Sequence, residues 1–545
     1  MSVCAAIIFG VVSLPLSLPP GSALAERPVV EVTPDAKYST AEQVGVTVLC
    51  ETDGPAPHQP PSFNTADVRS AEMGLEPRGG EEGFTGFLST GWTPPDPELA
   101  AGPNHVVIIA NGGIAFFQHD GTLDFTTSIN GAAGFWGGLG ATNFVFDPEA
   151  TFDPTSGRFF VMACERTNSA GFGDSFFLLA VSDDDDPNGA WFKYRLDVTA
   201  LGGGGDIDSP NLAVDGQAVY LTADFFTGGT KYLIYMLNKA NVLVGGAATA
   251  TSLLVTGTQS FGIARTLGVA PAMYMIENRS PATKVRLHAI DSPLASPTRV
   301  TFDLTVPLYS NSPEDPPQAG GGTRPETFGA RFWSCEWRNG SLWAVHHQNA
   351  TRVLARWYEI HTNGWPDSGD TPTLAQSGTI DPGPDIRTFF PAIASDDCGN
   401  AAVVFARSSP SEFISMWAAA RHADDAPGTM RAPVLIKATT VHYTVDRWGD
   451  YGGIEGDPVV GERLWMHHEF TLSGSNWRTW VEPFVARPKG DLTGDDAVTL
   501  DDVDPFIALL LGVDQDPYHA CMADMNRDGK MNALDVGPLV QELAL

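Results

Sequence analysis

The pattern that decides the fold is clear in residues 338–360, which read RNGSLWAVHHQNATRVLARWYEI. An Asn-Gly turn at 339–340 leads into an apolar run at 342–346, and a second apolar run at 353–360 follows after a polar break. Asn-Gly supplies the positive φ angles of a tight hairpin, and runs rich in valine, tryptophan and tyrosine favour strands. The stretch therefore predicts antiparallel strands joined by short turns.

The same pattern recurs from residue 92 to about residue 488. Short runs of Val, Ile, Phe, Tyr and Trp alternate with turns that carry Asp or Asn beside Gly, as at 119–121 and 214–216. No sustained helical period occurs in this region, so the sequence predicts an all-β body. A weak repeat of apolar strand, turn and aromatic-rich strand predicts a six- or seven-bladed β-propeller over 92–488. Two tandem β-sandwiches and a β-helix stay open as alternatives.

The start of the chain is typical of an exported protein. Residues 3–18 are almost wholly apolar, and Ala23-Leu24-Ala25 precedes Glu26, which is the pattern of a secretory signal. Residues 1–25 are therefore expected to be a signal peptide. Residues 26–91 mix Pro, Gly and charge, and we expect a poorly ordered lead-in with one strand near 44–50. No later apolar run in the sequence is long enough for a membrane span.

The balance of charge is strongly acidic. Asp and Glu number 65 against 32 Lys and Arg, a formal charge of −33. Nucleic acid and anionic membrane surfaces attract the opposite charge, so both classes of partner are disfavoured. Five cysteines follow the signal, and their spacing allows one or two disulfides without assigning the pairs. They are Cys50, Cys164, Cys335, Cys398 and Cys521.

Two acidic loops with the ligand spacing of a calcium site begin just after residue 488. Calcium takes about six to eight oxygen ligands, which a 12-residue loop offers at positions 1, 3, 5, 7, 9 and 12. Residues 491–502 and 524–535 both fit, with a main-chain carbonyl at position 7. The expected ligands are Asp491, Thr493, Asp495, Ala497, Thr499 and Asp502, and in the second loop Asp524, Asn526, Asp528, Lys530, Asn532 and Asp535.

The loops are followed by amphipathic segments. Apolar stripes predict helices at 503–511 and 536–543, and we interpret the stripes as the mutual core of the two helices rather than a partner-binding face. Gly529 supplies the sharp turn at position 6 of the second loop. Asp496 takes that place in the first loop, where Asp tolerates left-handed geometry.

Residues 489–545 resemble the type I dockerin repeat of secreted bacterial proteins, including Asp in place of Glu at position 12. The resemblance implies calcium as cofactor, a secreted or cell-surface location, and a cohesin-like or cell-surface partner. In cellulosomal dockerins, Ser and Thr at positions 10 and 11 often help to recognise the cohesin. Here those positions are Leu500-Asp501 and Ala533-Leu534, which fits anchoring on a cell surface or matrix equally well.

The densest cluster of chemical groups in the β body lies at 447–480. In a functional interpretation Asp450 or Glu469 is an acid/base catalyst, Arg447 clamps a carboxylate or sulfate, and Tyr451 adds a polar group to the pocket. The nearby tryptophans would then stack on sugar rings. The alternative is structural: an Arg447–Asp450 pair supports a blade junction, and the tryptophans fill the core between blades.

Other candidates in the body are weaker. The adjacent pairs at 346–347 and 467–468 each point one histidine to either face of a strand, so one member of each is a candidate to line a channel. Asp206, Asp208 and Glu336 are further candidates, whereas the turn at 182–191 is interpreted as structural. The sequence contains no Gly-x-Ser-x-Gly elbow, His-Glu-x-x-His helix or P-loop, which disfavours serine hydrolases, zincins and nucleotide enzymes.

Segments 95–105, 152–160 and 447–451 resemble a group of secreted bacterial propeller-like proteins of the sialidase-like or BNR-repeat kind. The resemblance implies a propeller over most of 92–488. Two functions stay open. One is a carbohydrate-active enzyme, a glycoside hydrolase or polysaccharide lyase acting on extracellular polysaccharide or glycan. The other is a non-catalytic surface or matrix protein whose propeller binds and whose tail anchors.

Overall fold

The computed structural model describes residues 83–141, 144–168, 173–258, 260–311, 314–349 and 352–543. Before them it describes only the backbone of β1 (Val29–Val32), β2 (Glu42–Gln43) and β3 (Val46–Cys50). The strand expected near 44–50 is confirmed as β3, which pairs with the outer strand of a blade. The signal peptide expected at 1–25 lies outside the described residues.

The described part of the body consists of seven antiparallel blades of four strands each. The first three, from inner to outer strand, are β5 (Glu98–Ala101), β6 (His105–Ala110), β7 (Gly113–Gln118), β8 (Leu123–Thr127); β9 (Val145–Asp153), β10 (Arg158–Arg166), β11 (Ser175–Ser182), β12 (Trp191–Asp197); and β13 (Asp208–Val214), β14 (Ala218–Phe225), β15 (Lys231–Asn238), β16 (Thr249–Thr256).

Blades four and five share one sheet because their inner strands β17 and β21 pair in parallel. The remaining blades are β17 (Gly262–Leu267), β18 (Met273–Asn278), β19 (Lys284–Asp291), β20 (Thr298–Thr305); β21 (Phe332–Arg338), β22 (Ser341–Asn349), β23 (Val353–His361), β24 (Thr373–Thr379); β25 (Arg387–Ser395), β26 (Ala401–Ser409), β27 (Glu412–Arg421), β28 (Val434–Lys437); and β29 (Gly453–Gly456), β30 (Arg463–Ser473), β31 (Asn476–Val485) with β4 (Phe84–Leu88).

The blades close into a ring, as the predicted propeller requires. The inner strands contact one another in the order β5, β9, β13, β17, β21, β25, β29 and back to β5. The strand β4 comes from the N-terminal side of the body and pairs with β31, so it completes the last blade. The body thus begins near residue 83 rather than at residue 92, because part of the expected lead-in is this closing strand. Radial closure leaves only short sheet edges at the rim.

The core is divided into seven apolar clusters. Six of them lie between two neighbouring blades, and the cluster between blades seven and one also includes residues of blades five and six. Trp191 packs between blades one and two, and Trp357 packs between blades five and six. Both faces of a blade are therefore buried, and every residue of β14 is buried. This arrangement explains why the strands read as nearly continuous apolar runs rather than as alternating ones.

Aspartates close the first hairpin of four blades. Asp153, Asp215, Asp396 and Asp457 each follow or end an inner strand, and each carboxylate accepts hydrogen bonds from backbone N–H groups two to four residues further on. An Asp side chain can thus replace a backbone acceptor in a tight turn. The turn signals that predicted the hairpins have this physical basis.

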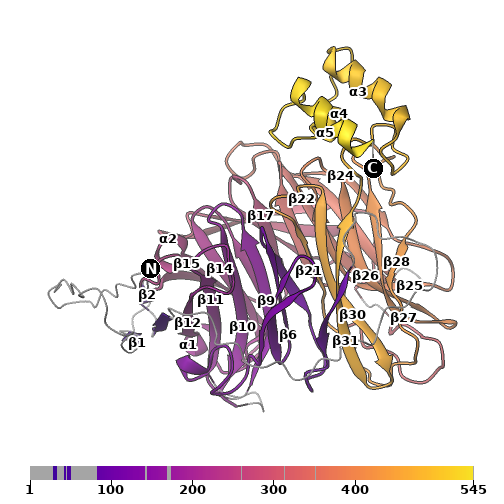
Figure 1. Cartoon of the computed structure of the whole chain (residues 1–545). Helices are drawn as coiled ribbons and strands as arrows, with labels where there is room; N and C mark the ends of the chain where they lie inside the picture. The colour runs from indigo at the N-terminus through magenta and orange to yellow at the C-terminus, as the bar shows by residue number, and fades with distance from the viewer. Residues whose placement is uncertain are drawn as a thin grey trace.

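The C-terminal module is the small helical unit at the top of Figure 1. The predicted helices are confirmed as α3 (Val503–Leu510) and α5 (Val536–Glu542), while α4 (Pro517–Ala523) was not predicted. Phe506, Leu509 and Leu539 form its core, but Leu511 and Val540 are exposed, so the stripes are only partly a mutual core. The short helices are η1 (Gly137–Leu139), α1 (Thr199–Gly202), α2 (Lys239–Val242), η2 (Leu500–Asp502) and η3 (Ala533–Asp535).

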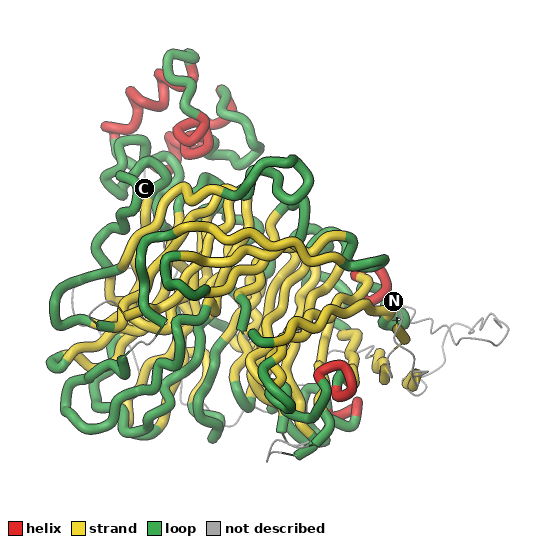
Figure 2. The backbone as a smooth tube through the Cα atoms, turned by 180° about the vertical axis from the view of Figure 1, so that it is seen from behind, coloured by secondary structure: helices red, strands yellow, loops and turns green. Residues whose placement is uncertain are grey.

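Helix is confined to short segments outside the blades, and Figure 2 shows the longer helices together in the module. Among the described residues, no helix has the length and apolar character needed to cross a membrane.

Candidate functional site

A pocket opens at the end of the ring where the inner strands begin. Its volume is about 320 Å³. The segments that precede or begin the inner strands of several blades supply the walls, so the pocket lies at the mouth of the central channel. Its polar lining consists of Thr93, Asp96, Asn111, Asp147, Arg166, Asp208, Ser209, Arg331, Arg447 and Asp450.

Four of these residues are aspartates from four different blades. The backbone N of Asp450 donates to Asp96 Oδ1 at 2.8 Å, and Asn111 Nδ2 donates to Asp96 Oδ2 at 2.8 Å. The side chains of Asp147 and Asp208 lie within hydrogen-bonding contact, which favours the protonated form of Asp147. The fold thus concentrates carboxyl groups that lie far apart in the sequence.

Burial and mutual repulsion raise the pKa values of these carboxyl groups. The pKa of Asp147 lies well above its usual range because of burial, then because of Asp208 and Asp450. Burial, then Asp450 and Asp147, raises the pKa of Asp96 in the same way. Burial also raises the pKa of Asp450, but the Arg447 guanidinium opposes this shift. Burial thus favours the protonated forms of Asp96 and Asp147, whereas Arg447 favours the ionised form of Asp450.

Three arginines line the same pocket. Nη2 of Arg447 lies 2.9 Å from both carboxylate oxygens of Asp450, and Nη2 of Arg166 lies 3.3 Å from Asp208 Oδ2. The Arg331 side chain has neither a hydrogen bond nor an ion pair among the described residues, and its guanidinium lies near the Trp333 ring, 5.4 Å from the centroid. Arg331 is therefore the pocket cation that remains available to a ligand.

The apolar wall of the pocket comes from residues that the sequence interpretation did not single out. Trp92 and Phe144 lie in ring contact, with centroids 5.4 Å apart, and Phe226 is partly exposed at the rim. Trp448, Trp465 and Trp477 are instead fully buried between blades. The structural alternative holds for these three tryptophans, and they cannot act as sugar platforms.

Glu469 and Tyr451 do not line the pocket. Glu469 is fully buried and forms an ion pair with His468. Tyr451 is also buried, and its hydroxyl donates to the Pro148 carbonyl at 2.9 Å. The candidate group at 447–469 is thus divided by the fold, because only Arg447 and Asp450 reach the mouth of the channel.

The four histidines of the two adjacent pairs are core residues. All four are fully buried, and within the described residues none lines the mouth pocket or the channel. Burial lowers the pKa of His346 and that of His467 to about 3, so both are neutral. Of the weaker candidates, Asp208 lines the pocket and Glu336 lines the channel, while Asp206 accepts the backbone N–H of Phe226 at 3.1 Å.

Below the mouth, the channel is lined by glutamates from four inner strands around one arginine. Arg265 Nε lies 3.0 Å from Glu455 Oε1, and Arg265 Nη1 lies 3.6 Å from Glu336 Oε2. Glu98 and Glu149 complete the lining. Burial raises the pKa of Glu98 to about 8, so this side chain is mostly protonated at neutral pH. The channel floor is therefore less negative than its composition suggests.

Asp96 and Asp147 carry a local signal that sequence reasoning could have used. Each precedes a proline at the start of an inner strand, as Ser209 and Phe390 do. All four have positive φ angles, of 47°, 48°, 48° and 48° respectively. A non-glycine residue in this region before proline is strained. The strained X-Pro step therefore recurs on the inner strands of four of the described blades, and in three of them it lines the channel mouth.

The two loops of the C-terminal module share one hydrogen-bonding pattern. The position-1 carboxylate accepts the backbone N–H of position 6, at 3.0 Å for Asp491 and 2.9 Å for Asp524. The position-12 carboxylate accepts the N–H of position 9, at 2.7 Å for both Asp502 and Asp535. All four carboxylates are buried in oxygen-rich loops. This donor set fits a hard cation such as calcium.

Residues 489–544 match the family model of the dockerin type I domain. The C-terminal module is a type I dockerin domain. Type I dockerin domains bind calcium, and proteins that carry them are typically extracellular or attached to the cell surface. No curated protein sequence matches the chain at a significant level.

Several solved structures are similar to parts of the body. CoXyl43, a GH43 β-xylosidase/α-arabinofuranosidase from a compost microbial metagenome, has 13% identity and a TM-score of 0.31 over 53% of this chain and 94% of its own. The sialidase of Trypanosoma rangeli has 11% identity and a TM-score of 0.32 over 71% and 57%. The Hadza microbial sialidase Hz136 has 10% identity and a TM-score of 0.38 over 72% and 65%. The propeller assignment itself rests on the strand order described above.

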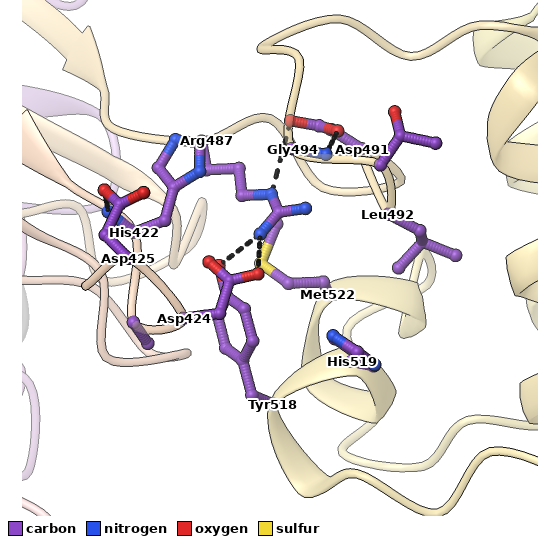
Figure 3. A network of polar contacts seen from close by, with 12 residues as sticks. His422, Asp424, Asp425, Arg487, Asp491, Leu492, Gly494, Tyr518, His519 and Met522 are labelled. Carbon is purple, nitrogen blue, oxygen red and sulfur yellow. Dashed lines mark hydrogen bonds and ion pairs between the residues drawn. The ribbon is translucent and has the colours of Figure 1, made fainter. Parts of the chain in front are cut away.

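The dockerin domain contacts blades six and seven at the end of the ring opposite to the pocket. Cys398, in the turn after β25, forms a disulfide with Cys521 of α4, while Cys164 and Cys335 are free and buried. Arg487 joins the two parts, with Nη1 at 3.0 Å from Asp424 and at 2.8 Å from the Tyr518 hydroxyl (Figure 3). The sequence allowed this disulfide but could not assign it.

Proposed function

We propose that the propeller is a secreted carbohydrate-active enzyme that hydrolyses a glycosidic bond of an extracellular polysaccharide at the channel mouth. The observation that carries the proposal is the meeting of four aspartates in one pocket, two of them paired with arginines. Most glycoside hydrolases use one protonated carboxyl group and one carboxylate on either side of the scissile bond. When the surroundings of two carboxyl groups push their pKa values apart, the group with the higher pKa serves as the acid and the other as the carboxylate.

Asp450 is the candidate carboxylate and Asp147 the candidate acid. Arg447 favours the ionised form of Asp450, whereas Asp147 is buried beside Asp208 and keeps a raised pKa. In this assignment Asp147 protonates the departing glycosidic oxygen, and Asp450 activates a water molecule or attacks the anomeric carbon. Arg447 holds Asp450 in position in place of the substrate clamp expected from the sequence.

The lining of the pocket favours a polysaccharide that contains acidic sugars. Arg331 offers an unpaired guanidinium, which suits a substrate carboxylate or sulfate. Trp92 and Phe226 offer apolar surface for the faces of sugar rings. We therefore expect uronate-containing or sulfated chains to be better substrates than neutral ones.

The test is a screen of the purified full chain on acidic and neutral polysaccharides, with new reducing ends as the readout. We expect turnover on an acidic substrate and a loss of at least about 100-fold in Asp450→Asn, because acid/base groups contribute at least this much. Asp303→Asn is the matched control, since Asp303 also pairs with an arginine, Arg286, but on an outer strand.

Two outcomes would contradict hydrolysis. Unsaturated product ends would identify a polysaccharide lyase. Binding without turnover across the panel would favour the non-catalytic function, in which the propeller is a binding platform and the dockerin domain anchors it.

For the dockerin domain we propose calcium binding at both loops and attachment to a cohesin-like or cell-surface partner. The twelve loop residues named above are the proposed ligands. Leu500 and Leu534, at positions 10 and 11 of their loops, are 78% and 66% exposed. An apolar partner surface therefore suits this domain better than one that recognises Ser and Thr.

A further inference from the structure

Each calcium loop of the dockerin domain has two residues in the left-handed backbone region, at positions 4 and 6. In the first loop they are Gly494 (φ 78°) and Asp496 (φ 68°), and in the second they are Arg527 (φ 57°) and Gly529 (φ 78°). Glycine adopts this region without steric cost, whereas other residues lose about 1 kcal/mol. Each loop therefore contains one charged residue, Asp496 or Arg527, at a position where glycine would fit the backbone turn at lower energy.

Both of these charged residues contact the propeller. Asp496 Oδ1 lies 3.0 Å from Arg431 Nη1 and 3.1 Å from His422 Nε2, and both partners follow β27. Arg527 Nε lies 3.1 Å from Oε2 of Glu462, in the turn before β30. In each loop, the place that could be a second glycine is thus occupied by a side chain that pairs with a blade.

A third contact reaches a proposed calcium ligand. Arg487 is 1% exposed, and its Nε lies 3.2 Å from Oδ2 of Asp491, the first residue of loop one (Figure 3). Its Nη1 contacts Asp424 of the propeller and the Tyr518 hydroxyl of the dockerin domain. The residue at the corresponding place before loop two is Ala520, which carries no charge. The first ligand of loop one is therefore held in place by an arginine that the propeller orients.

We propose that the two calcium loops also form the surface by which the dockerin domain docks on this chain's own propeller, so that calcium binding and docking favour each other. The inference rests on the calcium binding proposed above. Calcium holds the loops in the turn that presents Asp496 and Arg527 to the blades. By linkage, docking then strengthens calcium binding by the same factor.

The free energies expected for these ion pairs are consistent with reversible docking of the dockerin domain on the propeller. Partly exposed ion pairs contribute about 1 kcal/mol or less each, so they would not hold two free proteins together. The Cys398–Cys521 disulfide keeps the two surfaces at high effective concentration, and small contributions then suffice. Removal of the disulfide should therefore expose the dependence on calcium.

The experiment uses the full chain with Cys398→Ser and Cys521→Ser. Small-angle scattering measures compactness, and calorimetry with calcium chloride measures uptake. We expect a compact particle with calcium and a more extended one in EDTA. Arg431→Gln with Glu462→Gln removes one propeller partner of each loop without changing a loop. We expect an extended particle in calcium and a weakening of calcium binding by about fivefold or more.

A second variant separates docking from loop folding. Asp496→Gly with Arg527→Gly relieves the backbone strain of both loops, so we expect calcium uptake to persist while the particle becomes extended. Arg407→Gln is the matched control, because its pair with Glu412 lies at the far end of blade six, and it should behave as the parent.

Compactness that persists in EDTA, or compactness and calcium affinity unchanged in the Arg431→Gln and Glu462→Gln variant, would overturn the coupling. If the parent takes up no calcium at all, the calcium binding beneath the inference is wrong instead. The two failures are thus distinguished in one titration.

Discussion

Asp450 and Asp147 line the same pocket but differ in their neighbours. Asp450 faces a guanidinium, while Asp147 shares a hydrogen bond with another carboxyl group. Because the low-dielectric surroundings strengthen both interactions, two chemically identical side chains acquire different protonation preferences. At the scale of single residues, the candidate chemistry comes from these environments rather than from residue type.

Glu98 in the channel gives a prediction about pH. Its pKa in the folded state is about 8, against 4.5 for an unburied glutamate. The folded chain therefore keeps a proton that the unfolded chain releases, so the free energy of unfolding falls as pH rises from 4.5 to 8 and levels off above. Glu98→Gln cannot ionise, and its melting temperature should increasingly exceed that of the wild type across this window.

Thermal unfolding followed by circular dichroism at several pH values checks this expectation. Glu542→Gln, a change at an exposed glutamate of the dockerin domain, is the control and should show no such trend. A constant difference between Glu98→Gln and the wild type at all pH values would contradict the assigned ionisation.

At the scale of elements, β4 decides how the ring closes. Without it the last blade would have three strands, with the outer edge of β31 unpaired. The side chain of Phe87 enters the cluster between blades seven and one, and its backbone N donates to Thr479 Oγ1 at 2.7 Å. The strand thus stabilises the junction of the first and last blades.

Phe87→Ala should lower the free energy of unfolding by about 3 kcal/mol, because it leaves a cavity at this junction. The neighbouring Leu88→Ala should cost less than about 1 kcal/mol, since Leu88 is 36% exposed whereas Phe87 is 5% exposed. Urea denaturation measures both values. Equal costs would show that β4 does not seal the core.

At the scale of the whole molecule, the pocket and the dockerin domain lie at opposite ends of the inner strands. Asp450 and Asp147 precede or begin their inner strands, whereas Cys398 and Glu462 lie in turns beyond inner strands of blades six and seven. A partner held by the dockerin domain therefore leaves the channel mouth open. This arrangement suits an enzyme that is anchored while it acts on a polymer.

The disulfide between propeller and dockerin domain gives a prediction at this scale. It joins cysteines 123 residues apart, and closing a loop of that size stabilises a fold by about 4 to 5 kcal/mol. In calcium-free buffer, reduction should separate a low-temperature transition of the dockerin domain from that of the propeller. Differential scanning calorimetry shows the two transitions, and Cys398→Ala with Cys521→Ala should reproduce them without reductant. A single unchanged transition would contradict this prediction.

How much of the fold and the site could be predicted from the sequence depended on how far apart the interacting residues lie in the chain. Hairpin turns and the two loops were recognisable because their residues are neighbours in the chain. Of the acidic candidates, Asp450 lines the pocket and Glu469 is fully buried, a difference in depth that the sequence does not indicate. Asp96 was missed, although its Oδ1 accepts a hydrogen bond of 2.8 Å from the backbone N–H of Asp450.

By itself the sequence determined the all-β class and the dockerin domain with its two acidic loops, since each depends on patterns within about a dozen residues. Only the tertiary structure decided that there are seven described blades, that β4 closes the ring, and that Cys398 pairs with Cys521. It also decided which carboxyl groups share a pocket, such as Asp96 and Asp450, 354 positions apart. The physical reason is that these contacts lie between blades, where packing and burial act on residues that no local pattern connects.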